Sequence, residues 1–253
     1  MSVERGIAVA DRKRLAQPLS DERVLSIERA IAWGISGVDF ATADVRYRRL
    51  KRILDCVLVS LALIPLSLVM LITAFAVWAD SPGPIIFRQK RIGMNGVEFE
   101  MYKFRSMYHG CSAASHHAAT AQFIQGGVIN LANSEMPYKL GNDHRITPVG
   151  KFIRKTSVDE LPQLWNVLKG EMSIVGPRPP LEYEVALYSP RDLLRLSGKP
   201  GLTGPWQVYG RGKVTFQQMV EQDIAYVATQ SVLYDVRLML LTVPVLVLGR
   251  GGA

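Results

Sequence analysis

An uncharged run of 24 residues, from Cys56 to Ala79, constrains this chain more than any other feature. About 20 consecutive apolar residues suffice for a membrane-crossing helix, so the run is long enough. Pro65 lies near its middle, where a proline removes a backbone donor and clashes with the preceding turn. Hydroxyl groups at Ser60, Ser67 and Thr73 can satisfy the backbone groups that a bend frees. The run therefore predicts a membrane helix with a break near its centre.

Both ends of this run are basic. Five Lys and Arg residues lie within residues 46–52 before it, and Arg88, Lys90 and Arg91 follow it. Because positive residues favour the cytoplasmic side, this pattern favours a re-entrant helix that bends at Pro65 and leaves on the face it entered. A straight span with a tolerated proline remains the alternative, since prolines are common in membrane helices.

Composition narrows the possible partners. The 253 residues carry a formal net charge of +8 and are 48% hydrophobic, which excludes a disordered chain and favours contact with a membrane or an anionic ligand. Two cysteines, Cys56 and Cys111, are too few for a disulfide framework or a cysteine-built zinc site. Acidic residues interrupt the first 50 positions, which do not resemble a secretory signal. No aromatic–basic repeat is present, so we expect no nucleic-acid partner.

The pattern divides the chain into three parts. Residues 1–45 are expected to form a loosely ordered, partly helical leader, residues 46–80 the membrane helix, and residues 81–253 a cytosolic domain. The class is therefore α+β, with a re-entrant helix-break-helix joined to a small mixed helical and hairpin domain with interfacial amphipathic helices.

Local motifs give the expected elements of this domain. Residues 80–84, Asp-Ser-Pro-Gly-Pro, stop the membrane helix, and residues 87–107 predict a hairpin around Asn95-Gly96, a type I′ turn pair. Residues 109–142 have a weak pattern and are interpreted as a partly helical insertion, in which the adjacent His116 and His117 belong to the surface. Residues 238–248 are uncharged but too few to span, so this tail is expected on the membrane or in a core.

Adjacent carboxylates at Asp159 and Glu160 are the centre of the candidate site. The stretch from Ser157 to Glu160 has the S-x-x-E form of a capping box; alternatively, a helix begins at Asp159 and keeps Pro162 in its first turn. Two such carboxylates can act as a nucleophile and as a ligand for a hard cation such as Mg²⁺. They can also simply cap the helix. The expected helix has one apolar face and ends at Gly170; the face consists of Leu161, Leu164, Trp165 and Leu168.

Cationic and polar side chains are expected near Asp159 and Glu160, the pair of carboxylates called the dyad below. Lys103 and Arg105 alternate on a predicted strand and so share a face, and Arg178 stands on a loop stiffened by prolines. Each alone is typical of a solvated surface. Together, beside a membrane, they favour a phosphorylated substrate that meets a lipid acceptor. The candidates of this set are Lys103, Arg105, Arg154, Arg178, Gln207 and Arg211.

A series of motifs in fixed order resembles the bacterial sugar transferases, also called monotopic phosphoglycosyl transferases. The resemblance extends from about Arg48 to Gly251, four-fifths of the chain. The matching strings are DSPGP at 80–84, FRQ at 87–89 with RIG at 91–93, KFRSM at 103–107, DHRIT at 143–147, RKTSVDELPQL at 154–164, GPRP at 176–179, KPGLTG at 199–204, and WQV at 206–208 with GR at 210–211.

This resemblance implies an enzyme of the bacterial inner membrane whose catalytic domain faces the cytoplasm. It implies transfer of a sugar-1-phosphate from a UDP-sugar to undecaprenyl phosphate, after which downstream glycosyltransferases would use the product. Asp159 would attack the β-phosphate, form a phosphosugar–aspartyl intermediate and release UMP, while Glu160 would hold Mg²⁺. The phosphate ligands would be Lys103, Arg105 and Arg154, with Arg178 shaping the nucleotide pocket.

Two features depart from the family pattern. Many relatives have Ser-Pro at the helix break, which falls on Ser67-Leu68 here, whereas this chain has Pro65 about one turn earlier. Residues 109–142 are individual and could touch the sugar or a partner. Residues 1–45 cannot supply the helix bundle of the family's long forms, so we expect the short form. The sugar, the pathway and a homodimer stay open, and a membrane-anchored scaffold of the same fold is the alternative function.

Overall fold

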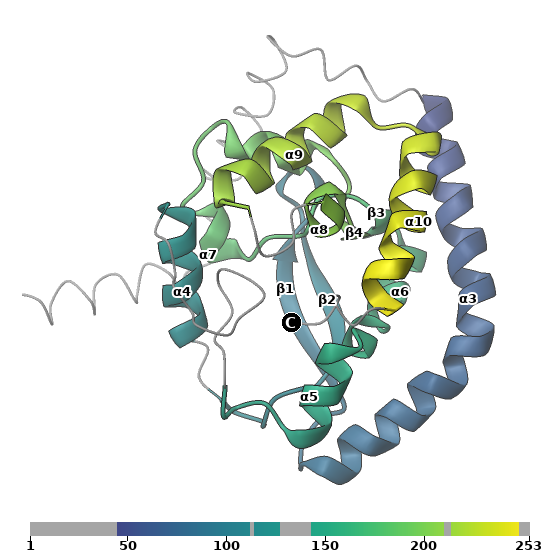
Figure 1. Ribbon diagram of the computed structural model, residues 1–253, viewed down its shortest axis with the longest axis vertical. Coiled ribbons are helices and arrows are strands. Elements are labelled where there is room, and N and C mark those ends of the chain that lie inside the picture. Colours follow the sequence, from purple (N-terminus) through teal and green to yellow (C-terminus); the bar gives the residue numbers. More distant parts are fainter. Residues whose placement is uncertain (1–44, 112–113, 127–142, 210–213, 248–253) are drawn as a thin grey trace, which may run out of the picture.

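The computed structural model describes residues 45–111, 114–126, 143–209 and 214–247 (Figure 1). Residues 1–44 of the expected leader, residues 112–113 and 127–142 of the expected insertion, and Arg211 lie outside this part. The described helices are α3 (Val45–Asp80), α4 (Ala114–Ile124), α5 (Pro148–Lys155), α6 (Gln163–Lys169), α7 (Glu182–Val185), α8 (Pro205–Tyr209), α9 (Phe216–Thr229) and α10 (Val232–Val247). The strands are β1 (Ile86–Ile92), β2 (Glu98–Phe104), β3 (Ser173–Val175) and β4 (Gly201–Thr203), and short 3-10 turns are η1 (Met94–Gly96), η2 (Val158–Glu160) and η3 (Asp192–Ser197).

Helix α3 is continuous through Pro65 and curves around the domain, which lies on its concave side (Figure 1). Near the proline, the Ser67 hydroxyl donates to the Ile64 carbonyl at 2.7 Å, and the Thr73 hydroxyl donates to the Val69 carbonyl at 2.8 Å. Such side-chain bonds satisfy carbonyls at a bend in an apolar helix. The expected irregularity near Pro65 is therefore a curve in one helix rather than a chain break.

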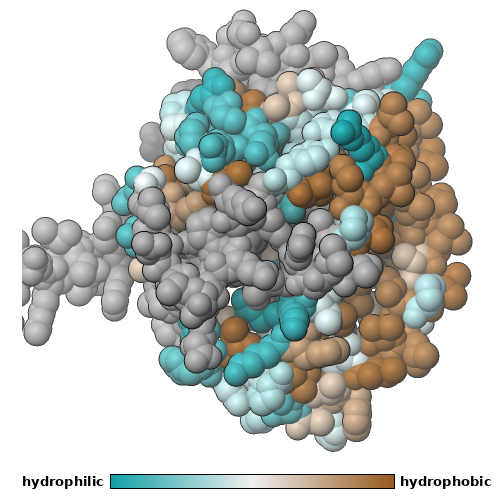
Figure 2. Space-filling view, in the orientation of Figure 1, coloured by the Kyte–Doolittle hydropathy of each residue, from teal (hydrophilic) through white to brown (hydrophobic). Residues whose placement is uncertain are grey.

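One stripe of α3 is buried and the opposite face is apolar and exposed. Tyr47, Lys51, Asp55 and Val59 are buried at a spacing of four residues, and Val77 is buried near the other end. Figure 2 shows the outer side of α3 as a broad hydrophobic surface. Within the described residues, α3 is the one helix long and apolar enough to cross a membrane. The exposed apolar side chains of its second half include Ile64, Leu68, Leu71, Ile72, Phe75 and Trp78.

The predicted hairpin is confirmed. Strands β1 and β2 pair antiparallel from Ile86 opposite Phe104 to Ile92 opposite Glu98. Asn95 has φ 57° and Gly96 has φ 81°, the positive angles that a type I′ turn requires. A second small sheet pairs β3 and β4 in parallel. The mixed α and β class is thus as expected.

The remaining helices cover the hairpin and close the core. Phe123 of α4 packs with Trp206 of α8 and with Phe216 and Val220 of α9. Helix α4 confirms that the 109–142 insertion is partly helical, although the side chains of His116 and His117 lie outside the described part. In α10, Leu238 is fully buried whereas Leu240 is 67% exposed, so the apolar tail packs in the core on one side and presents apolar residues on the other.

Candidate active site

The carboxylate dyad lies in the 3-10 turn η2, between α5 and α6. Ser157 has left-handed angles, φ 58° and ψ 14°, and its side chain caps nothing. Helix α6 begins at Gln163, so both expected helix starts, the capping box at Ser157 and a start at Asp159, are wrong. Pro162 explains the difference: it has no N–H to donate to the Val158 carbonyl, and Leu161 N makes this bond as a 3-10 contact at 3.2 Å.

The sharp turn at Ser157 exposes the two carboxylates differently. A non-glycine residue in the left-handed region is uncommon, and such strain gathers at functional sites. Asp159 is only 9% exposed, whereas the side chain of Glu160 is 42% exposed. One carboxylate is therefore held within the protein, and its neighbour is open to a ligand.

Lys103 is brought to the dyad, as the sequence predicted. Its ammonium group donates to Glu160 Oε1 at 2.6 Å, and its side chain is 24% exposed. Lys103 lies near the end of β2, and η2 packs against this strand. The two carboxylates and the Lys103 ammonium group thus lie together at a partly solvent-exposed position.

Asn166 fixes this arrangement and was missed by sequence reasoning. It is fully buried, accepts from Tyr102 N at 3.1 Å and donates to the Glu100 carbonyl at 2.6 Å, so it fastens α6 to β2 beside Lys103. The sequence signal for this contact is a single asparagine among apolar helix residues. This signal does not predict which strand the side-chain amide will bind.

Helix α5 carries Arg154 toward the same region. Thr147 caps this helix by accepting from Gly150 N at 2.9 Å, and a Cβ at Gly150 would lie 2.0 Å from the Ser106 carbonyl oxygen, so α5 packs closely on the chain after β2. Arg154, half-buried in the last turn, helps Arg145 hold the pKa of Asp143 below its usual value.

Arg105 has a different position from the one its strand spacing predicted. It follows the end of β2 and is buried, and its guanidinium donates to the Val77, Pro82 and Ser81 carbonyls at 3.2, 3.2 and 2.6 Å. These bonds fasten the C-terminal end of α3 to the domain. Arg105 therefore has a structural role, because it attaches the end of α3 to the domain. Of these two cations, only Lys103 contacts the dyad.

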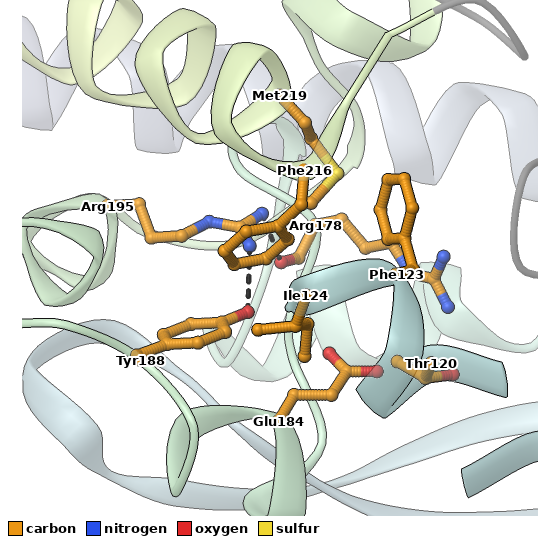
Figure 3. Close-up of a pocket in the computed structure, with 9 residues that line it drawn as sticks. All are labelled: Thr120, Phe123, Ile124, Arg178, Glu184, Tyr188, Arg195, Phe216 and Met219. Carbon is orange, nitrogen blue, oxygen red and sulfur yellow. Dashed lines mark hydrogen bonds between the residues drawn. The ribbon is translucent and has the colours of Figure 1, made fainter. Parts of the chain in front are cut away.

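Arg178 and Gln207 make their contacts apart from the dyad. Arg178 lines a pocket between α4, α7 and α9 (Figure 3), which is separate from the Lys103–Glu160 pair. Gln207 donates to the Leu202 carbonyl at 3.1 Å and so braces its own turn. Arg211 lies outside the described residues.

A buried polar cluster joins α3 to α10 and was also missed. Lys51 donates to Asp235 at 2.7 Å, and the hydroxyls of Tyr47 and Tyr226 donate to the same carboxylate at 2.9 and 2.6 Å. Burial raises the pKa of Tyr226 well above its usual value, so it remains a donor. The sequence signal for this cluster was Asp235, one of the few charged residues in the apolar tail.

The dyad offers ligands suited to Mg²⁺, though only a few. Carboxylate oxygens are hard ligands, and Mg²⁺ usually takes one or two of them with phosphate oxygens and waters. Within the described parts of the chain, no three His, Cys, Asp or Glu side chains form a cluster that could hold an ion. The donor set therefore fits an ion whose remaining ligands are phosphate oxygens or waters.

The fold thus brings together a buried carboxylate, a neighbouring carboxylate paired with a cation, and a long helix with an exposed apolar face. Residues 46–249 match the family model described as bacterial sugar transferase, and the chain belongs to this family.

Its relatives carry related names. The chain is 38% identical over 236 residues to the galactosyl transferase CpsE of Streptococcus agalactiae, covering 92% of this chain and 49% of that protein. It is 42% identical over 206 residues to the undecaprenyl-phosphate galactose phosphotransferase of Salmonella typhimurium, covering 81% and 42%. It is 39% identical over 201 residues to the exopolysaccharide production protein ExoY of Sinorhizobium fredii, covering 79% and 87%. The chain thus spans half or less of the first two relatives.

Proposed function

We propose that this protein transfers a sugar-1-phosphate from a UDP-sugar to undecaprenyl phosphate, as the first membrane step of exopolysaccharide, capsule or other glycoconjugate synthesis. The observation that carries the proposal is the pair of Asp159 and Glu160 beside Lys103, on a domain fastened to an apolar helix. Relatives named as transferases of galactose or glucose phosphate to undecaprenyl phosphate support the substrates.

In the first step, a carboxylate oxygen of Asp159 attacks the β-phosphorus of the UDP-sugar. The bond from this phosphorus to the bridging oxygen breaks, and UMP leaves with the electron pair. In the second step, a phosphate oxygen of the polyprenyl phosphate attacks the same phosphorus, and the Asp159 carboxylate leaves. Two steps through a covalent intermediate let one residue serve a soluble donor and an insoluble acceptor in turn.

Charge neutralisation falls to the neighbours of Asp159. Mg²⁺, when bound with the diphosphate, would neutralise the charge that develops on the leaving group. Glu160 would hold this ion, and Lys103 and Arg154 would bind phosphate oxygens. Arg105 is left out of this set because its guanidinium is committed to the carbonyls at the end of α3.

The placement of α3 supports a re-entrant anchor in the inner membrane, with the domain on the cytoplasmic side. Its first half is bonded to the domain through Lys51 and Asp235, and its second half through Arg105 and the Val77 carbonyl. A straight crossing would separate the two ends by about 30 Å of hydrocarbon. Both ends of α3 are instead attached to one folded body, which favours a helix that enters and leaves on one face.

Exposed apolar residues outside α3 support interfacial helices beside this anchor. Phe152 of α5 is 66% exposed, Trp165 of α6 is 58% exposed, and Val243 of α10 is 56% exposed. Amphipathic helices with such residues lie in the membrane interface.

The activity is tested by UMP release from a panel of UDP-sugars, with purified protein, Mg²⁺ and undecaprenyl phosphate. We expect acceptor-dependent UMP release from one donor, and its loss in Asp159→Asn while the variant folds and partitions into membranes like the wild type. A fully active Asp159→Asn variant would refute the aspartyl mechanism. No release from any donor by folded protein would favour the scaffold alternative.

The topology is tested by labelling single cysteines from the cytosolic side. In a background with Cys56 and Cys111 replaced by serine, Val45→Cys and Ile85→Cys should both react with a membrane-impermeant reagent added to inside-out vesicles. Reaction of the two positions from opposite sides would show a straight span and overturn the re-entrant placement.

A further inference from the structure

The edge of β2 that faces away from β1 is bonded to a side chain. Within the described residues, β1 and β2 form a two-stranded sheet, so this edge has no neighbouring strand. The Tyr102 N–H and the Glu100 carbonyl lie on it and are both bonded to Asn166 of α6. Backbone groups at a buried strand edge need such partners. Asn166 is fully buried and supplies both of them.

The Asn166 carboxamide takes the place of a peptide group in a third strand. Its Oδ1 accepts from Tyr102 N at 3.1 Å, and its Nδ2 donates to the Glu100 carbonyl at 2.6 Å. Nδ2 also donates to Glu171 Oε2 at 2.7 Å. A carboxamide has one acceptor oxygen and two N–H donors, so the oxygen and both donors are in use.

A second connection closes a ring of contacts at this position. Lys169 Nζ donates to Glu171 Oε1 at 3.1 Å and to the Tyr102 hydroxyl at 3.3 Å. Because an ionised carboxylate only accepts hydrogen bonds, Glu171 keeps the Nδ2 side of Asn166 toward itself and fixes the orientation of the amide. Tyr102, the residue before Lys103, is therefore held both at its backbone and at its hydroxyl.

Helix α6 and the dyad are held in place by further contacts. Arg52 of α3 donates to the carbonyls of Val167 and Leu168 at the end of α6. Val158 and Leu161, on either side of the dyad, pack in the apolar cluster between α3, α5 and β2. These contacts do not involve the carboxamide. The carboxamide therefore acts mainly on the strand edge that it binds.

We propose that Asn166 is a positioning residue that sets the distance between Lys103 and Glu160, and its effect on turnover rests on the proposed function. Lys103 follows Tyr102 directly in β2 and donates to Glu160 at 2.6 Å. Without the carboxamide, the edge of β2 gains freedom and Lys103 pairs with Glu160 for less of the time. Glu160 is then more available to Mg²⁺, while the ammonium is less well placed for phosphate. A misplacement of about 1 Å is enough to slow catalysis about 10²-fold.

A zero-length cross-link tests the distance without any substrate. A carbodiimide activates a carboxylate, and a neighbouring amine displaces the reagent as a urea and forms an amide. In the purified full chain in nanodiscs, mass spectrometry should find Lys103 joined to Glu160. Asn166→Leu should lower the yield of this cross-link several-fold. The exposed pair of Lys90 and Glu98, 3.4 Å apart on the same hairpin, is the internal reference and should be joined equally in both proteins.

Turnover tests whether the distance matters for the reaction. Asn166→Leu should lower kcat/KM about tenfold and lower the Mg²⁺ concentration for half-maximal rate, as Lys103→Met does. In a Lys103→Met background, Asn166→Leu should have little further effect, because it acts through a side chain that is no longer there. Equal losses in both backgrounds would show that Asn166 does not act through Lys103 and would overturn the proposal.

Asn166→Asp tests the two donors of the carboxamide at nearly constant size. The ionised aspartate accepts from Tyr102 N but repels the Glu171 carboxylate and the Glu100 carbonyl. Protonation restores one donor, so the activity relative to wild type at the same pH should rise as the pH falls. The titratable side chains around this position are Glu171, Lys169 and Tyr102. Adding Glu171→Gln removes the repulsion and supplies an N–H to the aspartate, so activity and cross-link should partly recover at neutral pH. No recovery by either route would contradict the role of the carboxamide.

Thr242→Val is the matched control for a lost hydrogen bond between elements. It removes the 2.9 Å bond between the Thr203 and Thr242 hydroxyls, which joins β4 to α10. Thermal unfolding should show a lower stability, whereas the cross-link and the Mg²⁺ dependence should stay as in the wild type.

Two outcomes separate this inference from the proposed function. If the wild type turns over no UDP-sugar but Asn166→Leu loses the cross-link, the proposed function fails and the positioning role stands. If the wild type is active and folded Asn166→Leu keeps both the cross-link and the Mg²⁺ dependence, only the positioning role fails.

Discussion

Lys103 Nζ lies 2.6 Å from Glu160 Oε1, and this ion pair joins β2 to a turn that is 57 residues later in the chain. The ammonium offsets the repulsion between the two adjacent carboxylates. Because the pair is partly exposed, a diphosphate or a metal ion can reach it. Lys103 and a divalent cation are therefore expected to compete for Glu160.

Removing the Lys103 ammonium group should separate its effect on phosphate binding from its effect on Mg²⁺ binding. Lys103→Met should lower kcat/KM by about one to two orders of magnitude, because a charge-assisted bond to phosphate is lost. The Mg²⁺ concentration for half-maximal rate should fall, since the ammonium group that competes with the ion for Glu160 is gone. UMP release measured against Mg²⁺ concentration gives both quantities. Lys90→Met, which breaks an exposed pair with Glu98 on the same hairpin, is the control and should act like the wild type. Wild-type kinetics in Lys103→Met would contradict the role.

The buried Lys51–Asp235 pair should stabilise the attachment of α3 to α10. Either Lys51→Met or Asp235→Asn should lower the free energy of unfolding by about 3–5 kcal/mol, because the remaining partner stays buried without its counter-charge. The double variant Lys51→Met/Asp235→Leu should recover part of this loss. Denaturant unfolding in detergent measures the effect. Removing the exposed Arg88–Glu100 pair should cost less than about 1 kcal/mol, and equal losses for both pairs would refute the buried role.

The elements fixed by local chemistry followed from the sequence. The apolar run predicts α3, the Asn95-Gly96 pair predicts the hairpin turn, and Gly170 ends α6 in the left-handed region as expected. The start of α6 did not follow, because the S-x-x-E pattern ignores the missing N–H of Pro162. A local motif is reliable only when no neighbouring residue breaks the hydrogen bonds it needs.

The candidate site was predicted only where charge and spacing sufficed. Lys103 beside Glu160 was an expected neighbour, but Arg105 has the same strand spacing and binds the end of α3 instead. Asn166 and the Lys51–Asp235 pair depend on contacts between distant elements. No local pattern shows which basic residue will be buried, because burial depends on how helices and strands pack across the whole chain.

Pro65 should set the curvature of α3. A straight helix from residue 46 to residue 78 would be about 48 Å long, and the curved helix should give a shorter distance. Spin labels at Arg46→Cys and Trp78→Cys, with Cys56 and Cys111 replaced by serine, measure it by double electron–electron resonance in nanodiscs. Pro65→Ala restores a donor for the Leu61 carbonyl and should lengthen the distance. Ser67→Ala, which keeps the proline, should change it less. An unchanged distance in Pro65→Ala would show that the domain contacts alone bend the helix.

The Asp143–Arg145 pair lies just before α5 in the chain. It should make the free energy of unfolding depend on pH. Arg145 Nη2 donates to Asp143 at 2.6 Å, and the side chains of Arg145 and Asp143 are 11% and 6% exposed. The pKa of Asp143 is lowered chiefly by this bond. A lowered native pKa stabilises the fold above the unfolded pKa, and this contribution disappears as the pH falls through the native value. Asp143→Asn should therefore lower the free energy of unfolding by about 1–3 kcal/mol at pH 7. The gap to the wild type should close on acidification, as denaturant titrations between neutral and acidic pH would show. Glu98→Gln, at an exposed carboxylate, should give a small gap throughout. A gap for Asp143→Asn that stays constant with pH would mean that the ionised carboxylate does not stabilise this turn.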